Sequence, residues 1–477
     1  MSEFKKLYLI FRKKSKKTLQ KEKHNKNYFI FGANIFKNFY LQKQIKFMTQ
    51  EKKQGNIVAI IMMIILFAMI AFVTNLAAPM GVITKEQFSF GNAMGMLGNM
   101  ANFIAYAVMG IPAGILLQRV GYKKTALIAV AVGFLGVFIQ YLSGHAASFL
   151  VYLLGAFVAG FSMCLLNTVV NPMLNTLGGG GNKGNQLIQV GGSFNSIMAT
   201  FTPAFVGILI GEVTKDTNIT NVFPVMYIAM GVFALIFFVL WAVSIPEPHV
   251  ERSSERLGRL MSGALKFRHF VLGAIGVFVY VGVEVGTPYT AVLWLSDASV
   301  SSVGAITAGS IAATFMFLMF IGRLFGASIG SKVSSKTMLT VTSALAMILL
   351  ALAIFSPTTS LVSLPLMSKS ATGALSFGFA QVPVNAMFIV LVGLCTSIMW
   401  GGIFNLAVEG LGKYLAVASG LFMVMVCGGG ILPAVQGWVA DIAGYIPSYW
   451  VMFAGFAYLL FYALIGSKNV NKNINIE

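Results

Sequence analysis

The sequence predicts an all-α membrane protein in which twelve transmembrane helices form two pseudo-symmetric six-helix bundles. Hydrophobic residues make up 57% of the 477 residues and charged residues only 10%, whereas soluble domains carry about 25% charged residues. The mean hydropathy is +0.82. The apolar residues fall in long runs, most of which reach the roughly 20 residues that a helix needs to cross a bilayer. These observations exclude a water-soluble enzyme and a disordered chain.

Each apolar run is expected to be helical, because hydrocarbon offers no hydrogen-bond partner to an open backbone. A membrane β-barrel would instead show short strands of alternating polarity. The predicted helices, in chain order, cover residues 56–83, 89–117, 125–145, 147–176, 187–211, 222–244, 269–296, 301–329, 336–355, 384–408, 416–440 and 447–466.

The placement of Lys and Arg predicts the orientation of these helices. With the N-terminus inside, the inner connections and tail carry fourteen Lys or Arg residues and the outer connections carry three. Cytoplasmic loops are enriched in these residues. We therefore expect a multi-pass protein of the cell inner membrane with both termini in the cytoplasm.

The domain organisation follows from the same runs. Residues 1–55 hold 15 of the 33 Lys and Arg residues and are predicted to be a disordered basic leader. Such a tail can bind anionic lipid or nucleic acid, but no nucleic-acid partner is expected here. The remaining predicted parts are a first bundle (56–244), a cytoplasmic linker (245–268), a second bundle (269–466) that contains a periplasmic insertion (356–383), and a cytoplasmic tail (467–477).

One internal repeat supports two related halves. The connection from Gly114 to Lys124 and the connection from Gly326 to Lys336 have the same spacing between the glycine and the last lysine. The two segments lie 212 residues apart. This offset suggests a duplicated six-helix unit, as in transporters built from parallel repeats.

Glu284 is the acidic residue in the apolar segments with the strongest indication of a functional role. The other acids beyond the leader lie in predicted loops or at helix ends, whereas Glu284 lies near the middle of the predicted helix 269–296. A charge at the bilayer centre costs a few kcal/mol or more and is usually functional. Glu284 is therefore the candidate for coupling to a proton or sodium ion. The alternative is a neutral carboxyl group that ties helices together.

The sequence argues against catalysis. No histidine lies deep in an apolar segment, and no Ser-His-Asp set, nucleotide loop or cluster of metal ligands is evident. The three cysteines lie singly in apolar segments and are expected to pack. No enzyme activity, metal or cofactor is expected, apart from a transported proton or sodium ion.

Amide and aromatic residues are common inside the predicted helices. Amides donate and accept hydrogen bonds and aromatic rings cover apolar C–H groups, so this combination suits a sugar. The alternative role of each residue is a hydrogen bond between helices. The predicted substrate-binding residues are Asn75, Asn167, Asn171, Asn195, Tyr280, Trp400, Asn405 and Gln436.

Several segments resemble one known family of membrane proteins. The connection Arg119-Val-Gly121-Tyr-Lys123-Lys124 resembles that of the major facilitator superfamily. Within it, the chain is similar to the fucose–galactose–glucose symporter family over residues 56–466. The most specific segments are Val170–Gly178, Ser193–Ser196, Tyr280–Gly286, Gly322–Gly326, Ser397–Phe404, Leu406–Gly412 and Pro433–Gly437.

The resemblance implies alternating access to a sugar site between the two bundles, usually driven by protons. The family has acids at the positions of Ala78 and Asn167, so Glu284 remains the candidate for coupling. A glutamine of the family's sugar pocket falls at Gly192, which predicts extra room and a larger or different ligand, such as a disaccharide or an amino sugar.

The expected function is therefore secondary active transport of a mono- or small oligosaccharide, coupled to a proton or sodium ion. An uncoupled facilitator, a transporter of a nucleoside, peptide or drug, and a non-transporting sensor are the alternatives. The expected partners are the sugar and the lipid bilayer, with the protein a monomer. The predicted conformational gate residues are Arg119, Lys123 and Arg323.

Overall fold

The computed structural model describes residues 57–75, 97–210, 219–247, 257–297, 303, 305–369 and 375–470. Within these ranges, eleven helices are long and apolar enough to cross a membrane. A further helix, α7, is 30 residues long but begins with the polar segment Asn182-Lys183-Gly-Asn185-Gln186. Together they match the twelve predicted runs in order. The predicted leader 1–55 and the end of the predicted tail lie outside the described residues.

The first six long helices lie within or close to their predicted runs, and the predicted end of the first run (76–83) and start of the second (89–96) lie outside the described residues. α4 and α5 are separated by Gly121 alone, whose φ of 87° is a conformation that glycine adopts without strain. Ser148 caps α6 by accepting a hydrogen bond from the Val151 N–H group. The described helices are Ile57–Asn75, α4 (Leu97–Val120), α5 (Tyr122–Ala146), α6 (Phe149–Leu177), α7 (Gly181–Ile210), the short η1 (Ile219–Val222) and α8 (Phe223–Ala242).

In the second half, two predicted helices are interrupted. The run 384–408 is divided at Ser397, and the run 416–440 contains a short 3-10 turn. The predicted linker contains a short helix, α9, which packs near α15. The elements are α9 (Leu257–Leu265), α10 (Arg268–Ser296), α11 (Ala305–Ile329), α12 (Ser335–Phe355), α13 (Val384–Thr396), α14 (Met399–Val408), η2 (Gly412–Tyr414), α15 (Leu415–Val424), η3 (Met425–Cys427), α16 (Gly428–Ala443), α17 (Tyr445–Phe461) and η4 (Tyr462–Gly466).

The segment 356–383 contains an antiparallel hairpin that the sequence analysis did not predict. Its strands are β1 (Leu361–Lys369) and β2 (Leu375–Pro383). The hairpin packs on α11, where the Met367 N–H group donates to the Thr314 hydroxyl oxygen at 2.8 Å. The sequence did not indicate β1 because this segment contains Pro365, and a proline within a run argues against a regular strand. Here it lies in a two-stranded sheet, where an edge position tolerates it.

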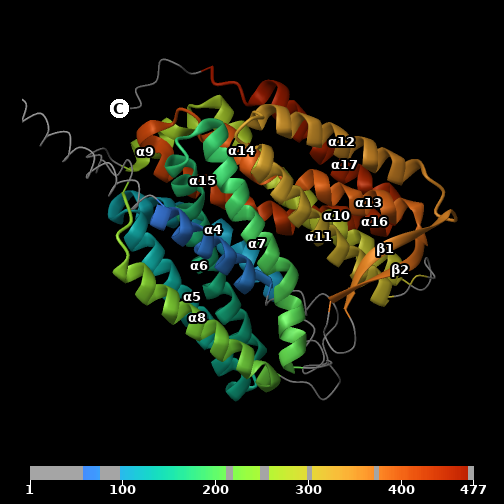
Figure 1. Ribbon diagram of the computed structural model, residues 1–477, viewed down its shortest axis with the longest axis horizontal. Helices are drawn as coiled ribbons and strands as arrows, with labels where there is room; N and C mark the ends of the chain where they lie inside the picture. Colours follow the sequence, from blue (N-terminus) through green and yellow to red (C-terminus); the bar gives the residue numbers. More distant parts are fainter. Residues whose placement is uncertain are drawn as a thin grey trace, which may run out of the picture. The chain divides into compact units, whose positions relative to one another are not determined.

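Helices of the same half pack mainly on one another (Figure 1). α6 contacts α4 and α5 in the first half, and α10 contacts α16 and α17 in the second. The two most extensive contacts between the halves are those of α4 with α15 and of α7 with α11. Among the twelve predicted helices, α4 and α15 are the second and the eleventh, and α7 and α11 are the fifth and the eighth. If each helix is replaced by its equivalent in the other six-helix half, the first pair becomes the second pair. This is the relation expected of a duplicated unit.

The α4–α15 pair crosses at glycines. A Cβ atom added to Gly420 would lie 2.5 Å from the Gly110 carbonyl oxygen and 2.6 Å from the Gly114 Cα atom. The two α4 glycines are four residues apart, the spacing that lets membrane helices approach closely. The crossing lies near the end of α4 that carries Arg119. We call this end of the helices the basic end. It also holds Lys123 at the start of α5, Lys332 between α11 and α12, and Lys336 at the start of α12.

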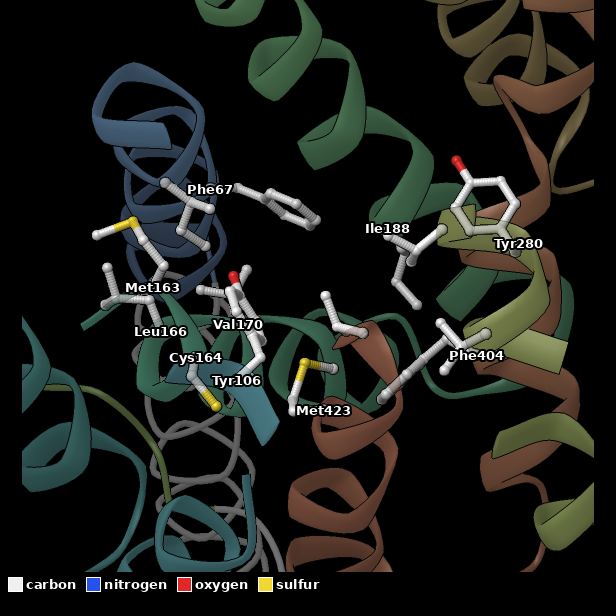
Figure 2. Packing of buried hydrophobic residues seen from close by; sticks show 14 of the residues in the cluster. Phe67, Tyr106, Met163, Cys164, Leu166, Val170, Ile188, Tyr280, Phe404 and Met423 are labelled. Atoms are coloured by element: carbon white, nitrogen blue, oxygen red, sulfur yellow. The ribbon is translucent and has the colours of Figure 1, made fainter. Parts of the chain in front are cut away.

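Buried apolar side chains fill the space between the helices. Figure 2 shows Phe67 of the first helix, Tyr106 of α4, Met163 and Val170 of α6 and Met423 of α15 in this cluster, and all five are buried. Since lipid is as apolar as these side chains, close packing rather than removal from water holds them together. The same packing fixes the helices that carry the polar residues described next.

Candidate functional site

A cavity of about 210 Å³ lies between helices of the two halves. Residues of the first helix, α4, α6 and α7 line one side, and residues of α10, α11, α14, η3 and the α13–α14 junction line the other. The lining combines apolar side chains with uncharged amides and one ion pair. Its polar and aromatic members are Phe67, Thr74, Asn75, Asn102, Phe103, Tyr106, Asn167, Gln189, Asn195, Glu284, Arg323, Ser397 and Trp400.

The ion pair joins Glu284 of α10 to Arg323 of α11. One Nη2–Oε1 distance of 3.3 Å connects them, which is longer than the about 2.7–2.9 Å of a strong charge-assisted bond. The side chain of Glu284 is 19% exposed and that of Arg323 10%. Among the described residues that line the cavity, Glu284 is the one carboxylate. The predicted coupling residue therefore faces the cavity beside a buried cation.

Arg323 binds both halves of the protein. Its Nη1 atom donates to the Gly192 carbonyl oxygen at 3.1 Å and to the Ser196 hydroxyl oxygen at 2.7 Å, and it lies 3.3 Å from the Asn195 side-chain oxygen. Its Nε atom donates to the Ser397 carbonyl oxygen at 3.1 Å. Arg323 is one of the predicted gate residues. Its side chain lines the cavity and binds both halves, and a gating role stays a prediction.

The extra room expected at Gly192 is occupied. A Cβ atom added to Gly192 would lie 3.5 Å from the Arg323 Cδ atom, an ordinary van der Waals distance. The guanidinium group passes over the glycine and binds its carbonyl oxygen. The guanidinium group therefore lies in the space beside Gly192, and a larger or different ligand stays a prediction.

Four predicted substrate-binding residues line the cavity. These are Asn75, Asn167, Asn195 and Trp400. Asn167 donates to the Tyr106 hydroxyl at 2.7 Å, Asn195 donates to the Phe67 carbonyl oxygen at 2.9 Å, and Asn75 donates to the Ala71 carbonyl oxygen at 2.8 Å. The cavity brings these residues together, and their contact with a substrate stays a prediction.

The other four predicted residues are not among the cavity lining. Asn171 accepts a hydrogen bond from the Trp400 indole N–H at 2.9 Å, and this bond helps to fix the orientation of the ring. Tyr280 is fully buried, with its ring centroid 6.1 Å from that of Trp400. Gln436 is fully buried in α16, and its amide has no hydrogen-bond partner in the described part of the chain. Asn405 binds two other helices.

Several amides form hydrogen bonds between the halves at the basic end. Asn175 of α6 donates to the Asn405 side-chain oxygen at 2.6 Å, and Asn405 donates to the Ser335 hydroxyl oxygen at 2.9 Å. Gln186 and Gln189 of α7 donate to the carbonyl oxygens of Ala327 and Ile398 at 3.0 and 2.8 Å. The Asn405–Ser335 bond lies within the second half, and we call the other three bonds, made by Asn175, Gln186 and Gln189, the amide contacts. They hold the halves together at the basic end.

The predicted gate residues Arg119 and Lys123 do not join the halves in this structure. Arg119 is exposed. The Lys123 ammonium group donates to the carbonyl oxygens of Trp241 and Val243 at 2.8 and 2.6 Å. The Glu247 carboxylate accepts from the backbone N–H groups that begin α5. These bonds tie the α4–α5 connection to the end of α8 within the first half, and a gating role stays a prediction.

The sequence analysis missed several cavity residues. Tyr106 and Phe67 line the cavity but look like ordinary core residues in an apolar run. Ser397 of the lining and Ser196 both bind Arg323. These two serines lie in the segments Ser397–Phe404 and Ser193–Ser196, which carry the family resemblance, and Tyr106 and Phe67 carried no sequence signal. In the described ranges, no group of three His, Cys, Asp or Glu residues is placed to hold a metal ion.

The chain is similar to characterised families of membrane proteins. The model of the Major Facilitator Superfamily matches residues 60–432. A glucose/galactose transporter of Brucella abortus biovar 1 (strain 9-941) is 31% identical over 418 residues, which cover 85% of this chain and 93% of that protein. The L-fucose-proton symporter of Escherichia coli (strain K12) is 23% identical over 393 residues, covering 76% and 82%.

Solved structures agree with this similarity at the level of the fold. The crystal structure of the transporter FucP in the outward conformation superimposes with a TM-score of 0.74 at 20% identity, covering 87% of this chain and all of that chain. The proton:xylose symporter XylE gives a TM-score of 0.63 at 12% identity, covering 85% and 95%. The twelve-helix arrangement in two halves is therefore shared with known transporters.

Proposed function

The chain belongs to the major facilitator superfamily, and from this premise we propose that it carries a monosaccharide across the membrane by alternating access, in symport with a proton. The observation that carries the proposal is the cavity between the halves, which combines neutral amides and aromatic rings with one carboxylate. Neutral hydrogen-bonding groups suit hydroxyl groups, and the carboxylate can take up and release a proton.

Three features favour a sugar of small size. The amides of Asn75, Asn102 and Asn167 can donate to and accept from hydroxyl groups. The rings of Phe67 and Trp400 offer apolar surfaces to C–H groups. A cavity of about 210 Å³ lies below the range of roughly 300–1,000 Å³ for drug-sized ligands, which favours a monosaccharide over a disaccharide. Relatives named glucose/galactose transporter support the same class.

Proton coupling is assigned to Glu284. It is the carboxylate of the cavity in the described part of the chain, and Arg323 lies beside it. Intramembrane carboxylates commonly take part in proton relays. A relative named L-fucose-proton symporter supports a proton as the coupled ion.

Transport requires that the amide contacts break. They hold the halves together at the basic end, so opening that end must separate α6 and α7 from their partners in α11 to α14. A sugar and a proton can favour this change only if they bind one arrangement better than the other. We place the basic end and both termini in the cytoplasm, and the protein in the inner membrane, because Lys and Arg residues are concentrated there.

Uptake into proteoliposomes tests the proposal. Purified protein is reconstituted and given radiolabelled glucose, galactose or fucose under an imposed proton gradient, a sodium gradient or none. We expect accumulation of at least one of these sugars with the proton gradient and exchange of that sugar without a gradient. Accumulation with sodium alone would reassign the ion, and equilibration unaffected by any gradient would show a facilitator. No movement of any sugar would overturn the proposal.

A further inference from the structure

Arg323 makes a set of hydrogen bonds that divides between the two halves. Gly192, Asn195 and Ser196 all lie on α7 in the first half. Ser397 and Glu284 lie in the second half, as does Arg323 itself. A movement that separates α7 from α11 therefore removes three partners of the guanidinium group together and leaves two.

Opening of the basic end separates α7 from α11 beside Arg323. Gln186 of α7 binds the Ala327 carbonyl oxygen of α11, and Ala327 lies one helical turn beyond Arg323. Gly192 and Ser196 follow Gln186 on the facing side of α7, because they bind Arg323. Breaking the first contact and moving the helices apart thus withdraws α7 from the guanidinium group.

A buried guanidinium group needs compensation after this withdrawal. Arg323 is buried, and a buried charge without partners is strongly unfavourable. The Glu284 carboxylate is the nearby group that can replace α7, and it moves with α11 because both belong to the second half. In the present arrangement, neutral groups of α7 accept hydrogen bonds from the guanidinium group, and its single bond to Glu284 is long. Glu284 can take up a proton here without leaving Arg323 unpaired.

We propose that Arg323 exchanges partners during transport, bound to α7 in the arrangement seen here and to ionised Glu284 when α7 has moved away. The inference rests on the proposed function and extends it to the control of coupling. Withdrawal of α7 favours the ionised carboxylate, so the proton leaves Glu284 for water on the newly opened side. Contact with α7 favours its return.

The same exchange would prevent the protein from carrying a proton alone. Moving α7 away while Glu284 is protonated leaves the guanidinium without α7 and without an ionised partner. The hydroxyl oxygens of a sugar in the cavity can accept its hydrogen bonds at that stage, since Arg323 lines the cavity. Sugar and proton therefore cross together, and the empty protein returns with Glu284 ionised.

Other titratable groups near Glu284 are few. Within the described ranges, Tyr280 lies one turn earlier on α10, and Tyr106 lines the same cavity from α4. The remaining charged or titratable residues on elements that contact α10 are Arg259 of α9, Cys395 of α13, Cys427 of η3, Asp441 of α16, Tyr445, Tyr449 and Tyr458 of α17 and Tyr462 of η4.

The test removes the closest α7 partner of Arg323. Ser196→Ala deletes the acceptor at 2.7 Å. Ser196→Thr keeps a hydroxyl group and serves as the rescue. Ser193→Ala is the matched control, since the Ser193 hydroxyl donates to the Gln189 carbonyl oxygen within α7 and does not touch Arg323. Each protein is assayed for sugar exchange and for proton-driven uptake across a pH series, with a thermal melt to confirm folding.

We expect the pH midpoint of proton-driven uptake to fall in Ser196→Ala by about half a unit or more, because Arg323 turns toward Glu284 and the proton is held less firmly. Ser196→Thr and Ser193→Ala should keep the wild-type midpoint. In a Glu284→Gln background the Ser196→Ala change should alter no pH dependence. A folded Ser196→Ala protein with an unchanged or raised midpoint would overturn the partner exchange while leaving transport intact. Wild-type protein that exchanges no sugar would overturn the proposed function and this inference with it.

Discussion

At the scale of single residues, the surroundings of Glu284 decide what this chain can couple. A carboxylate in an apolar helix would be costly alone, but Glu284 is partly exposed to the cavity and lies beside Arg323. The pair is held by one long contact rather than by a two-bonded fork. This geometry lowers the energetic cost of the buried Glu284 charge. It also leaves the carboxylate able to take up and release a proton.

Glu284→Gln tests this residue directly. The amide cannot exchange a proton at physiological pH but keeps the shape and an acceptor oxygen for Arg323. We expect sugar exchange to persist while proton-driven accumulation falls to the equilibrium level. Radiolabel uptake with and without a gradient measures both. Accumulation equal to that of the wild type would remove Glu284 from the coupling mechanism.

Gly192 lies against Arg323, so the effect of a substitution at position 192 should depend on the size of the new side chain. Gly192→Ala adds a Cβ atom at an ordinary distance from the arginine and should leave proton-driven uptake near the wild-type rate. Gly192→Gln needs the space that the guanidinium occupies. We expect it to displace Arg323 and to destabilise the fold by up to the roughly 3–5 kcal/mol typical of breaking a buried ion pair. Melting temperature and uptake would show this, and equal values for both variants would contradict it.

Glu284 and four of the eight predicted substrate residues line the cavity, and their roles stay predictions. An acid in the middle of an apolar run stands out against its neighbours, whichever way its helix is turned. Asn171 and Asn405 are equally polar, but they bond to Trp400 and Asn175 about 230 residues away in sequence. Which amide faces the cavity depends on helix rotation and on contacts between the halves, and neither can be derived from a single helix.

At the scale of elements, the glycine crossing of α4 and α15 should control how closely the halves approach. Gly420→Ala would place a Cβ atom against backbone atoms of Gly110 and Gly114, which cannot rotate away. Overpacking of this kind costs about 1–3 kcal/mol, a factor of about 5 to 150 in a two-state population. We expect the arrangement with the basic end open to gain population.

Spin labels on α4 and α15 near the basic end would measure this shift as a longer distance between them. Gly437→Ala is the matched control, because an added Cβ atom at Gly437 of α16 meets no atom within 4 Å. The same distance distribution for Gly420→Ala and the control would contradict a role of the crossing in setting the equilibrium.

The hairpin is expected to serve stability. Thr314→Val keeps the side-chain shape but removes the acceptor for the buried Met367 N–H group. Leaving such a donor unpaired costs about 1–3 kcal/mol. We therefore expect a lower melting temperature with unchanged sugar exchange. A loss of exchange in a fully stable variant would instead assign the hairpin a part in transport.

The helices and the hairpin differ in how far the sequence predicts them. In lipid, an apolar run of sufficient length has no alternative to a helix, and the twelve predicted runs correspond to the observed helices. The strands Leu361–Lys369 and Leu375–Pro383 lack this constraint. Their sequences contain proline and glycine, which are depleted in strands, and their pairing rests on each other and on α11.

At the scale of the whole molecule, the amide contacts should have to break in every transport cycle. In a background in which Cys164, Cys395 and Cys427 are replaced by serine or alanine, Asn175→Cys with Asn405→Cys places two thiols where the side chains now touch at 2.6 Å. A short bifunctional thiol reagent should join the halves and stop sugar exchange. Each single variant, treated in the same way, is the control. Full exchange in the cross-linked protein would show that these helices do not separate.

The crossing of α4 and α15 also affects the speed at which the basic end opens. Glycines at the contact have no side chain that must change rotamer or leave a groove, and the attraction between touching carbon atoms is only about 0.1–0.2 kcal/mol per pair. Backbone can therefore slide past backbone here with little resistance. We therefore expect the slow step of opening to lie at the amide contacts of α6 and α7, because these buried polar groups must exchange their partners for water as the helices separate.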